Sequence, residues 1–139
     1  MKFIFGCGGT GGHIYPALAL AQEFASGGHK VLFIGNFDSM EERLVKREGY
    51  PFLPIQVRKL SRKLHPSLLA FPFFLAASVV KCVHYLKKHR PDGVICTGGY
   101  VSGPVAIAAV MLKIPLYFHE SNSFPGITTR YLARRTTIT

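Results

Sequence analysis

Residues 2–18 read KFIFGCGGTGGHIYPAL, a short apolar run that leads through glycines into the start of a helical pattern. The apolar run at residues 2–7 is bounded by glycines, as is typical of a strand buried on both faces of a parallel sheet. Pro16 suits the first turn of a helix, and apolar residues then recur at helical spacing until Gly27 and Gly28 end the pattern. The stretch therefore predicts a β-loop-α unit.

The rest of the chain repeats this alternation of strands and helices. Further strands are expected at residues 31–34, 52–57, 94–96 and 116–118, and helices at 39–48, near 101–112 and after Pro125. With 139 residues, 48% of them hydrophobic, the chain is long enough for one core and too short for two domains of ordinary size. The pattern predicts one α/β domain over residues 1–139, built on a Rossmann-like, doubly wound parallel sheet.

The charge balance favours an anionic partner. Lys and Arg total 17 against 7 acidic residues, a formal net charge of +10, which suits nucleic acid, phospholipid or a diphosphate. No known nucleic-acid-binding motif accompanies the charge, so a nucleic-acid partner is not expected. Cys7, Cys82 and Cys96 lack metal or disulfide spacing and no signal peptide of normal length fits the N-terminus, so a reducing cytoplasm is the expected setting.

The glycine-rich segment at residues 6–13 lies between the first predicted strand and helix. Backbone N–H groups and a helix N-terminus can face an anion there without a β-carbon in the way, so a phosphate or diphosphate site is expected; the alternative is a plain tight turn. A dinucleotide site is disfavoured because Gly35 and Asn36 stand where its acidic residue belongs. A nucleotide-triphosphate P-loop is excluded because His13 and Ile14 stand where it requires Lys and then Ser or Thr.

Three segments together resemble the MurG family, the N-acetylglucosaminyltransferases that form lipid II. They are GGTGGHIYPA at residues 8–17, GGYVSGP at 98–104 and HESNSFPG at 119–126, and they follow the first, fourth and fifth predicted strands. One departure is Ser121, where the family usually carries Gln. Loops at the carboxyl ends of parallel strands line one cleft, so the three segments are expected to meet.

The resemblance implies the N-terminal, acceptor-binding half of a GT-B glycosyltransferase, whose donor-binding C-terminal domain is absent from this chain. The reaction implied is the inverting transfer of N-acetylglucosamine from UDP-N-acetylglucosamine to lipid I, without a cofactor. No protein-bound metal is expected, because Asp38 and Asp92, the only aspartates, are too far apart in sequence for the paired-aspartate motif of other glycosyltransferases. The isolated chain is expected to be inactive or nearly so.

The matched family positions imply roles for individual residues. His13 is the expected general base, because an imidazole can take a proton near neutral pH, and Glu120 is expected to orient the base or a sugar hydroxyl. The alternative for both is a structural role at a helix end. Donor contacts are expected from Thr10, Gly11, Gly12 and Asn122, and acceptor contacts from Gly99, Tyr100 and Ser102.

An apolar stretch at residues 68–80 lies between two groups of basic residues. It is too short to span a bilayer core of about 30 Å and is interrupted by Pro72, so it is expected to dock on an anionic membrane surface at the cytoplasmic face, as a peripheral contact. The alternative is a core helix with solvated basic ends. The residues expected to contact the membrane are Lys63, Leu69, Phe71, Phe73, Phe74 and Lys81.

Two other functions stay open at this point. Another GT-B lipid glycosyltransferase, with a different sugar or acceptor, would use the same kind of N-terminal domain and would differ in its donor domain. A non-catalytic membrane-docking subunit that recruits a separate donor-binding chain would fit the length of this chain better than a complete enzyme does.

Overall fold

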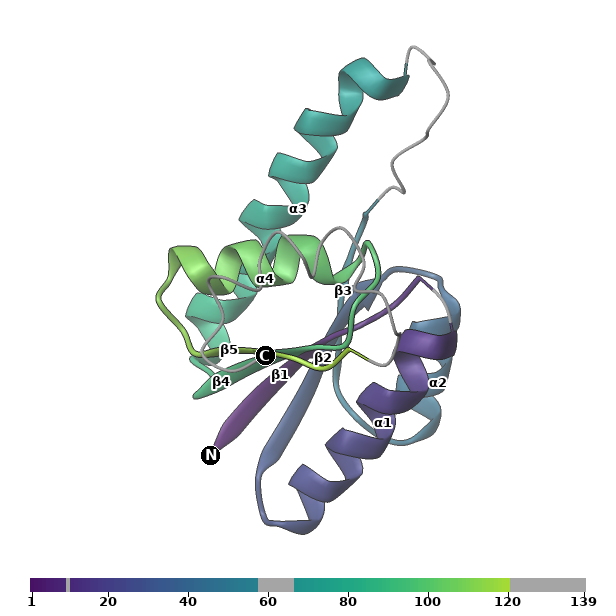
Figure 1. Ribbon diagram of the computed structural model, residues 1–139, viewed down its shortest axis with the longest axis vertical. Coiled ribbons are helices and arrows are strands. Elements are labelled where there is room, and N and C mark those ends of the chain that lie inside the picture. The colour runs from purple at the N-terminus through teal and green to yellow at the C-terminus, as the bar shows by residue number, and fades with distance from the viewer. Residues whose placement is uncertain (10, 58–66, 121–139) are drawn as a thin grey trace.

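The computed structural model describes residues 1–9, 11–57 and 67–120, the side chains of residues 67–71 excepted. Within these residues the centre is a five-stranded sheet in the order β3-β2-β1-β4-β5, in which every neighbouring pair is parallel (Figure 1). Its strands are β1 (Lys2–Gly6), β2 (Lys30–Asn36), β3 (Phe52–Ile55), β4 (Gly93–Cys96) and β5 (Leu116–Phe118). The predicted strands are all present, and none of their ends differs from the prediction by more than two residues.

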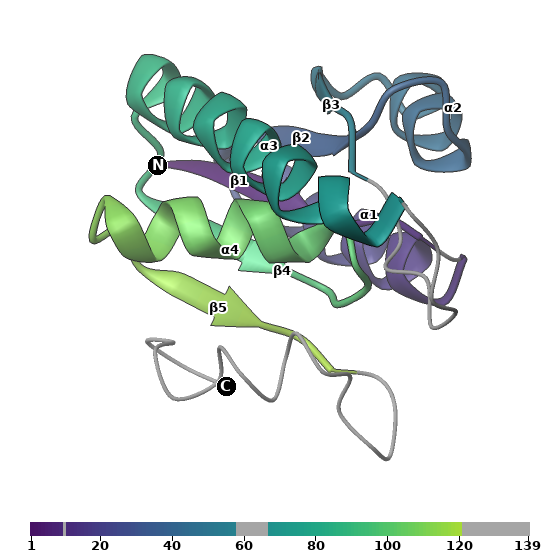
Figure 2. The ribbon, with the colours of Figure 1, turned by 90° about the horizontal axis from the view of Figure 1, so that it is seen from above.

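In the part of the chain that the structure describes, two pairs of helices cover the two faces of the sheet. The pair α1 (Gly11–Ser26) and α2 (Met40–Arg47) packs on one face. The pair α3 (Ser67–His89) and α4 (Ser102–Met111) packs on the other, where the two helices lie side by side (Figure 2). The chain thus winds outward from β1 in both directions, and the predicted doubly wound α/β fold is confirmed.

Side chains alternate between the two faces along each strand. In β1, Ile4 packs into the core under α3 and α4, and Phe5 into the core under α1 and α2. In β2, Leu32 and Phe33 divide in the same way. Because both faces are covered by helices, both sets of side chains are apolar, and this is why the strands read as unbroken apolar runs.

The first helix begins earlier than the sequence suggested. α1 starts at Gly11, so Pro16 lies inside the helix and the prediction that it occupies the first turn was wrong. Proline has no N–H to donate to the carbonyl of Gly12, four residues earlier. The helix still continues through this point, because Ile14 and Ala17 are fully buried and their packing outweighs one missing hydrogen bond.

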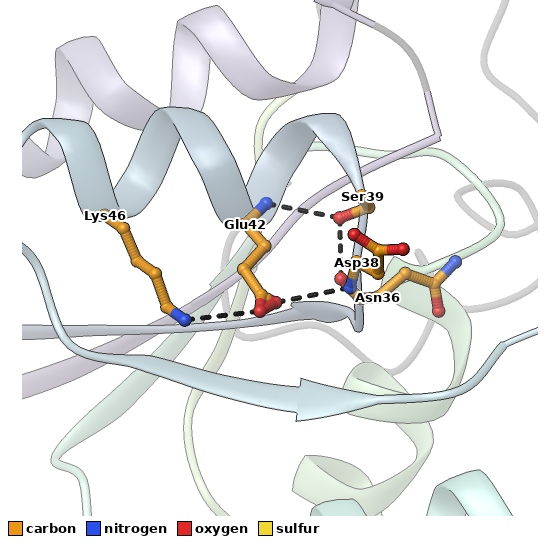
Figure 3. A network of polar contacts seen from close by, with 5 residues as sticks. All are labelled: Asn36, Asp38, Ser39, Glu42 and Lys46. Atoms are coloured by element: carbon orange, nitrogen blue, oxygen red, sulfur yellow. Dashed lines mark hydrogen bonds and ion pairs between the residues drawn. The ribbon is translucent and has the colours of Figure 1, made fainter.

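The predicted helix that follows β2 is confirmed, and it begins with a serine N-cap (Figure 3). Ser39 Oγ accepts a hydrogen bond from the backbone N–H of Glu42 (3.2 Å) and donates one to the carbonyl of Asn36 (2.6 Å). The Glu42 carboxylate accepts from the N–H of Asp38 (3.3 Å) and pairs with Lys46 one turn later (3.3 Å). These contacts fix the first turn of α2 against the end of β2.

The helix α3 contains the apolar stretch that was expected to face a membrane. Its N-terminal turns extend past the sheet (Figure 1), while Cys82 and Leu86, nearer its C-terminus, are buried in the core. Among the described residues, no helix combines the length and the apolar character needed to cross a membrane. The helix expected after Pro125 lies outside the described residues.

Candidate functional site

The winding of the chain reverses between β1 and β4, the position at which sheets of this kind form their ligand crevice. The strands β1 and β4 are neighbours in the sheet, and the helices that follow them lie on opposite faces. The loops after these strands leave the same carboxyl edge of the sheet before their helices turn to opposite faces, and this edge is the usual position of a ligand in such folds. The first two glycine-rich segments are thus brought together, as the sequence predicted.

The two glycine-rich loops touch through their backbones at the base of the crevice. The carbonyl oxygen of Gly8 lies in the space that a β-carbon on Gly99 would need, and Gly99 has a φ of 82°. Any other residue at position 99 would therefore be strained and would also push the loops apart. The strand pairing continues into this region through a hydrogen bond from the N–H of Thr97 to the carbonyl of Gly6 (3.3 Å).

His13 lies between the two loops, half-buried, in the first turns of α1. Its Nδ1 is 2.9 Å from the carbonyl oxygen of Thr97. A carbonyl oxygen only accepts hydrogen bonds, so the neutral imidazole must carry its hydrogen on Nδ1, which leaves a lone pair on Nε2. In this tautomer the ring can take a proton through Nε2, as the role of general base requires.

The start of α1 offers the backbone N–H groups expected of an anion site. The first turn of a helix has N–H groups that the helix itself does not satisfy, and they carry the positive end of the helix dipole. Gly12 is exposed, Gly11 is half-buried, and no acidic side chain lies in this turn. This geometry is compatible with the donor contacts expected of Gly11 and Gly12.

Ser102 has a different position from the one expected of a ligand contact. Its side chain is 0% exposed, and its Oγ lies 3.0 Å from the carbonyl oxygen of Gly6 and 2.7 Å from that of Gly98. A hydroxyl has one hydrogen to donate, and both neighbours are acceptors, so the two carbonyls share it. Ser102 joins the ends of β1 and β4, and any part it has in acceptor binding is indirect.

Tyr100 crosses the first glycine-rich loop towards the end of β2. Its ring packs on Gly9, where a β-carbon would come within 3.0 Å of a ring carbon, and its hydroxyl is 3.5 Å from Asn36 Nδ2. The Asn36 amide in turn makes two hydrogen bonds with the backbone of Val57, to its carbonyl (3.1 Å) and from its N–H (2.7 Å). Tyr100 is half-buried, so one side of it remains open to a ligand.

Glu41 is a residue of this region that the sequence reading missed. It is 4% exposed, its Oε1 accepts a hydrogen bond from the N–H of Asn36 (3.3 Å), and its side chain packs against Gly8 and Gly35. The available signal was its spacing: Glu41 lies four residues before Val45, the buried apolar residue of α2, and so shares its helical face. Because most residues of α2 are charged and solvated, the sequence gives little sign that the Glu41 side chain is buried.

The third family segment is described only at its beginning. His119 is exposed, and its N–H donates to the carbonyl of Cys96 (2.8 Å), which keeps this segment beside β4. Glu120 follows and is half-buried. Thr10 and Asn122, two of the expected donor contacts, lie outside the described residues, as does Lys63.

The outer side of α3 has the chemical character expected of the membrane contact. Phe73 is 78% exposed and Val80 is 68% exposed, two turns apart, and Lys81 is exposed beside them. Phe74 is only half-buried. Leu69 and Phe71 belong to α3, but their side chains are not described.

The described part of the chain contains no cluster of metal ligands. There, His, Cys, Asp and Glu side chains form no group of three or more that would hold a metal ion. The expectation that the reaction needs neither a metal nor a cofactor stays a prediction.

Comparison with known proteins identifies the relatives of this chain. Residues 3–139 match the glycosyltransferase family 28 N-terminal domain. A relative from Halothermothrix orenii, named UDP-N-acetylglucosamine--N-acetylmuramyl-(pentapeptide) pyrophosphoryl-undecaprenol N-acetylglucosamine transferase, is 46% identical over 133 residues, covering 96% of this chain and 36% of the relative. A protein of the same name from Bacillus pumilus is 46% identical over 136 residues, covering 96% and 37%.

A solved structure gives the same result for the fold. The crystal structure of MurG from Acinetobacter baumannii superposes with a TM-score of 0.84 at 33% identity, covering 99% of this chain and 39% of that one. The resemblance drawn from the three motifs is thereby confirmed, and so is the assignment to the N-terminal, Rossmann-like domain of GT-B glycosyltransferases. The chain spans little more than a third of the length of these relatives.

Proposed function

The chain belongs to the glycosyltransferase family 28 N-terminal domain family, and on this premise we propose that it is the acceptor-binding half of an N-acetylglucosaminyltransferase. The reaction is the transfer of N-acetylglucosamine from UDP-N-acetylglucosamine to lipid I, which gives lipid II for peptidoglycan synthesis. The observation that carries the proposal is the convergence of two glycine-rich loops on His13, in a chain 46% identical to relatives named for this transfer.

The geometry supports a direct displacement with His13 as the base. The 4-hydroxyl oxygen of the muramyl sugar attacks the anomeric carbon of the donor, its proton passes to Nε2 of His13, and the bond to UDP breaks with both electrons leaving on the diphosphate. Attack from the side opposite UDP inverts the anomeric centre. The Nδ1 contact with Thr97 supports this role because it keeps Nε2 available as the acceptor.

The remaining residues of the crevice divide between the two substrates. N–H groups at the start of α1, with Thr10, Gly11 and Gly12, stabilise the negative charge of the donor diphosphate, and Asn122 contacts the donor from the third loop. On the acceptor side, Gly99 and Tyr100 line the crevice, and Ser102 holds their loop in place. Glu120 orients the base or a sugar hydroxyl.

The other parts of the enzyme lie beyond the described domain. The relatives are nearly three times as long as the part that this chain matches, which supports a donor-binding C-terminal domain that closes on the crevice. An undecaprenyl-linked acceptor stays in the membrane, so the acceptor domain must approach the cytoplasmic surface of the bilayer. The exposed apolar side chains of α3, followed by Lys81, Lys87 and Lys88, suit peripheral docking on anionic lipid.

Calorimetry on this chain tests the proposal. A soluble lipid I analogue should bind, while UDP-N-acetylglucosamine should bind weakly or not at all, because most of its contacts are expected from a C-terminal domain such as the longer relatives have room for. Tight binding of the UDP-sugar without binding of the analogue would show that the crevice belongs to the donor. Equal binding of analogues with other sugars would favour a lipid glycosyltransferase of another specificity.

A matched pair of variants locates the diphosphate contact. Gly12→Asp places a carboxylate at the exposed N-terminal end of α1, and the weak binding of UDP-N-acetylglucosamine, measured at high ligand concentration, should fall about tenfold or more. Gly27→Asp adds the same charge just beyond the opposite end of α1, where a β-carbon meets only ordinary contacts, and should leave binding unchanged. Equal effects of the two variants would argue against a phosphate contact at Gly12.

A further inference from the structure

Thr97 contacts His13 at two separate atoms. Its carbonyl oxygen accepts from the ring Nδ1 (2.9 Å), and its side-chain Oγ1 donates to the backbone carbonyl of His13 (2.5 Å). One residue after β4 therefore holds both the imidazole and the main chain of a residue that follows β1, 84 positions away in sequence. Thr97 is itself 1% exposed and is tied to β1 through its N–H and Gly6.

The imidazole is also confined by the glycines that follow Thr97. A β-carbon on Gly98 would lie 2.9 Å from Nδ1 of His13, and one on Gly99 would lie 3.0 Å from the ring carbon Cδ2. The ring thus packs on the bare backbone of the second loop. Rotating it by half a turn would move Nδ1 away from the Thr97 carbonyl, so the packed orientation and the hydrogen bond support each other.

We propose that Thr97 is a positioning residue that selects the Nδ1–H tautomer of His13 and so keeps Nε2 free to take the acceptor proton. The importance of this tautomer for catalysis rests on the proposed function, in which His13 is the base. The tautomer itself is a property of the unliganded domain and can be measured without any turnover.

The hydroxyl of Thr97 is the part of this arrangement that a substitution can remove. The bond from Nδ1 depends steeply on distance and angle, and it survives only while the first turn of α1 stays in register with the end of β4. The Oγ1 bond to the His13 carbonyl maintains that register. Valine has nearly the shape of threonine without the hydroxyl, and serine keeps the hydroxyl without the methyl group.

Nitrogen NMR of the histidine side chains tests the proposal on the isolated chain. The spectrum is recorded above the titration range of the rings, and the His13 signals are identified by their loss in His13→Gln. In the wild-type protein the hydrogen should be on Nδ1. Thr97→Val should lower the ratio of the Nδ1–H to the Nε2–H form by roughly 2- to 10-fold, the effect of weakening one hydrogen bond, and Thr97→Ser should restore it.

A control separates positioning from general loss of stability. Ser78 is 4% exposed, and its Oγ lies 2.6 Å from the carbonyl oxygen of Gln56, which follows β3, and 3.0 Å from that of Phe74, so Ser78→Ala removes a comparable hydroxyl that contacts neither His13 nor Thr97. It should lower the unfolding free energy without changing the His13 tautomer. A wild-type hydrogen on Nε2, or a ratio that Thr97→Val leaves unchanged, would overturn the proposal. Neither result would affect the calorimetric test of acceptor binding.

Discussion

The carboxylate of Glu41 lies in the space that a β-carbon on Gly8 would occupy. The contact is enclosed, since Glu41 is 4% exposed and Gly35 packs on its other side. Gly8 is therefore needed for packing, because the absence of a side chain there lets Glu41 of α2 lie directly against the first glycine-rich loop. A carboxylate at this end of the loop would repel an anion, so the proposed phosphate contact is expected at the end that enters α1.

Gly8→Ala should be strongly destabilising. The new methyl group would meet the Glu41 carboxylate, and the φ of 141° at this position is one that residues other than glycine rarely adopt. Strain and overpacking together should cost roughly 2–5 kcal/mol of unfolding free energy, measured by denaturant titration. The control is Gly28→Ala, which has a φ of 86° with no atom within 4 Å and should lose only about 1 kcal/mol. Equal losses would mean that the Glu41 contact does not constrain Gly8.

The strands could be predicted from the sequence because their environment is uniform. Phe5 and Phe33 alternate with Ile4 and Ile34 in runs buried on both faces, so composition alone revealed them. The alternation of elements predicted the doubly wound parallel sheet, and with it the meeting of loops at its carboxyl edge, but the order of the strands was not predicted. These are properties of a whole element, and single-residue contacts do not decide them.

The details of the crevice could not be predicted because single contacts between distant residues decide them. Pro16 gave a helix-start signal that the burial of its neighbours overrode. Ser102 was taken as a ligand contact, since nothing in its sequence neighbourhood shows that its hydroxyl lies between two carbonyls. Glu41 resembled a solvated helix residue, although the glycines that admit its side chain lie in two other elements.

Asn36→Leu should destabilise the carboxyl edge of the sheet. The substitution removes both hydrogen bonds to the backbone of Val57 and leaves the partly buried N–H and carbonyl of that residue without their side-chain partner. The unfolding free energy should fall by roughly 1–3 kcal/mol in denaturant titration. The nearby Lys46→Ala, which loses one exposed ion pair with Glu42, should cost less than about 0.5 kcal/mol. A smaller loss in Asn36→Leu than in Lys46→Ala would contradict this assignment.

The buried thiols should make the domain less stable in alkali. Burial raises the pKa of Cys7 to about 12, helped by the Glu41 carboxylate, and burial raises that of Cys82 to about 12, although Lys81 opposes it. In the unfolded chain a thiol titrates near 9.0, so above that pH the unfolded state loses protons that the folded state keeps. The stabilisation is complete below pH 9 and should decline up to about pH 12, by about 1.4 kcal/mol per pH unit for each thiol.

Cys82→Ala isolates one of these thiols from the lysines and tyrosines that titrate in the same range. Unfolding free energies are compared at several pH values between about 8.5 and 11, where the variant should show a slope shallower by about one proton. Ile4→Val, a buried substitution without a titrating group, should lower the whole curve by about 1 kcal/mol and leave its slope unchanged. An unchanged slope in Cys82→Ala would mean that this thiol ionises as easily in the folded protein as in the unfolded one.

Phe73→Asp should weaken binding to anionic vesicles. Phe73 is 78% exposed on the outer side of α3, and transferring a phenylalanine side chain from water into the acyl boundary contributes about 1.5–3 kcal/mol. Loss of that contribution, with repulsion of the new carboxylate, should reduce partitioning about tenfold or more in liposome flotation. Lys81→Glu should reduce it less, by about tenfold at most for a charge near the surface, and its effect should shrink as salt is added.

The same substitution elsewhere tests whether the effect belongs to α3. Phe37 is 60% exposed in the connection between β2 and α2, and Phe37→Asp makes an identical chemical change away from the outer side of α3. If α3 is the docking surface, Phe37→Asp should float with vesicles as the wild-type protein does. Vesicles without anionic lipid should bind neither of these two proteins. Equal losses in the two phenylalanine variants would show that general hydrophobicity drives the association. Full retention in Phe73→Asp would show that α3 is not the surface that meets the membrane.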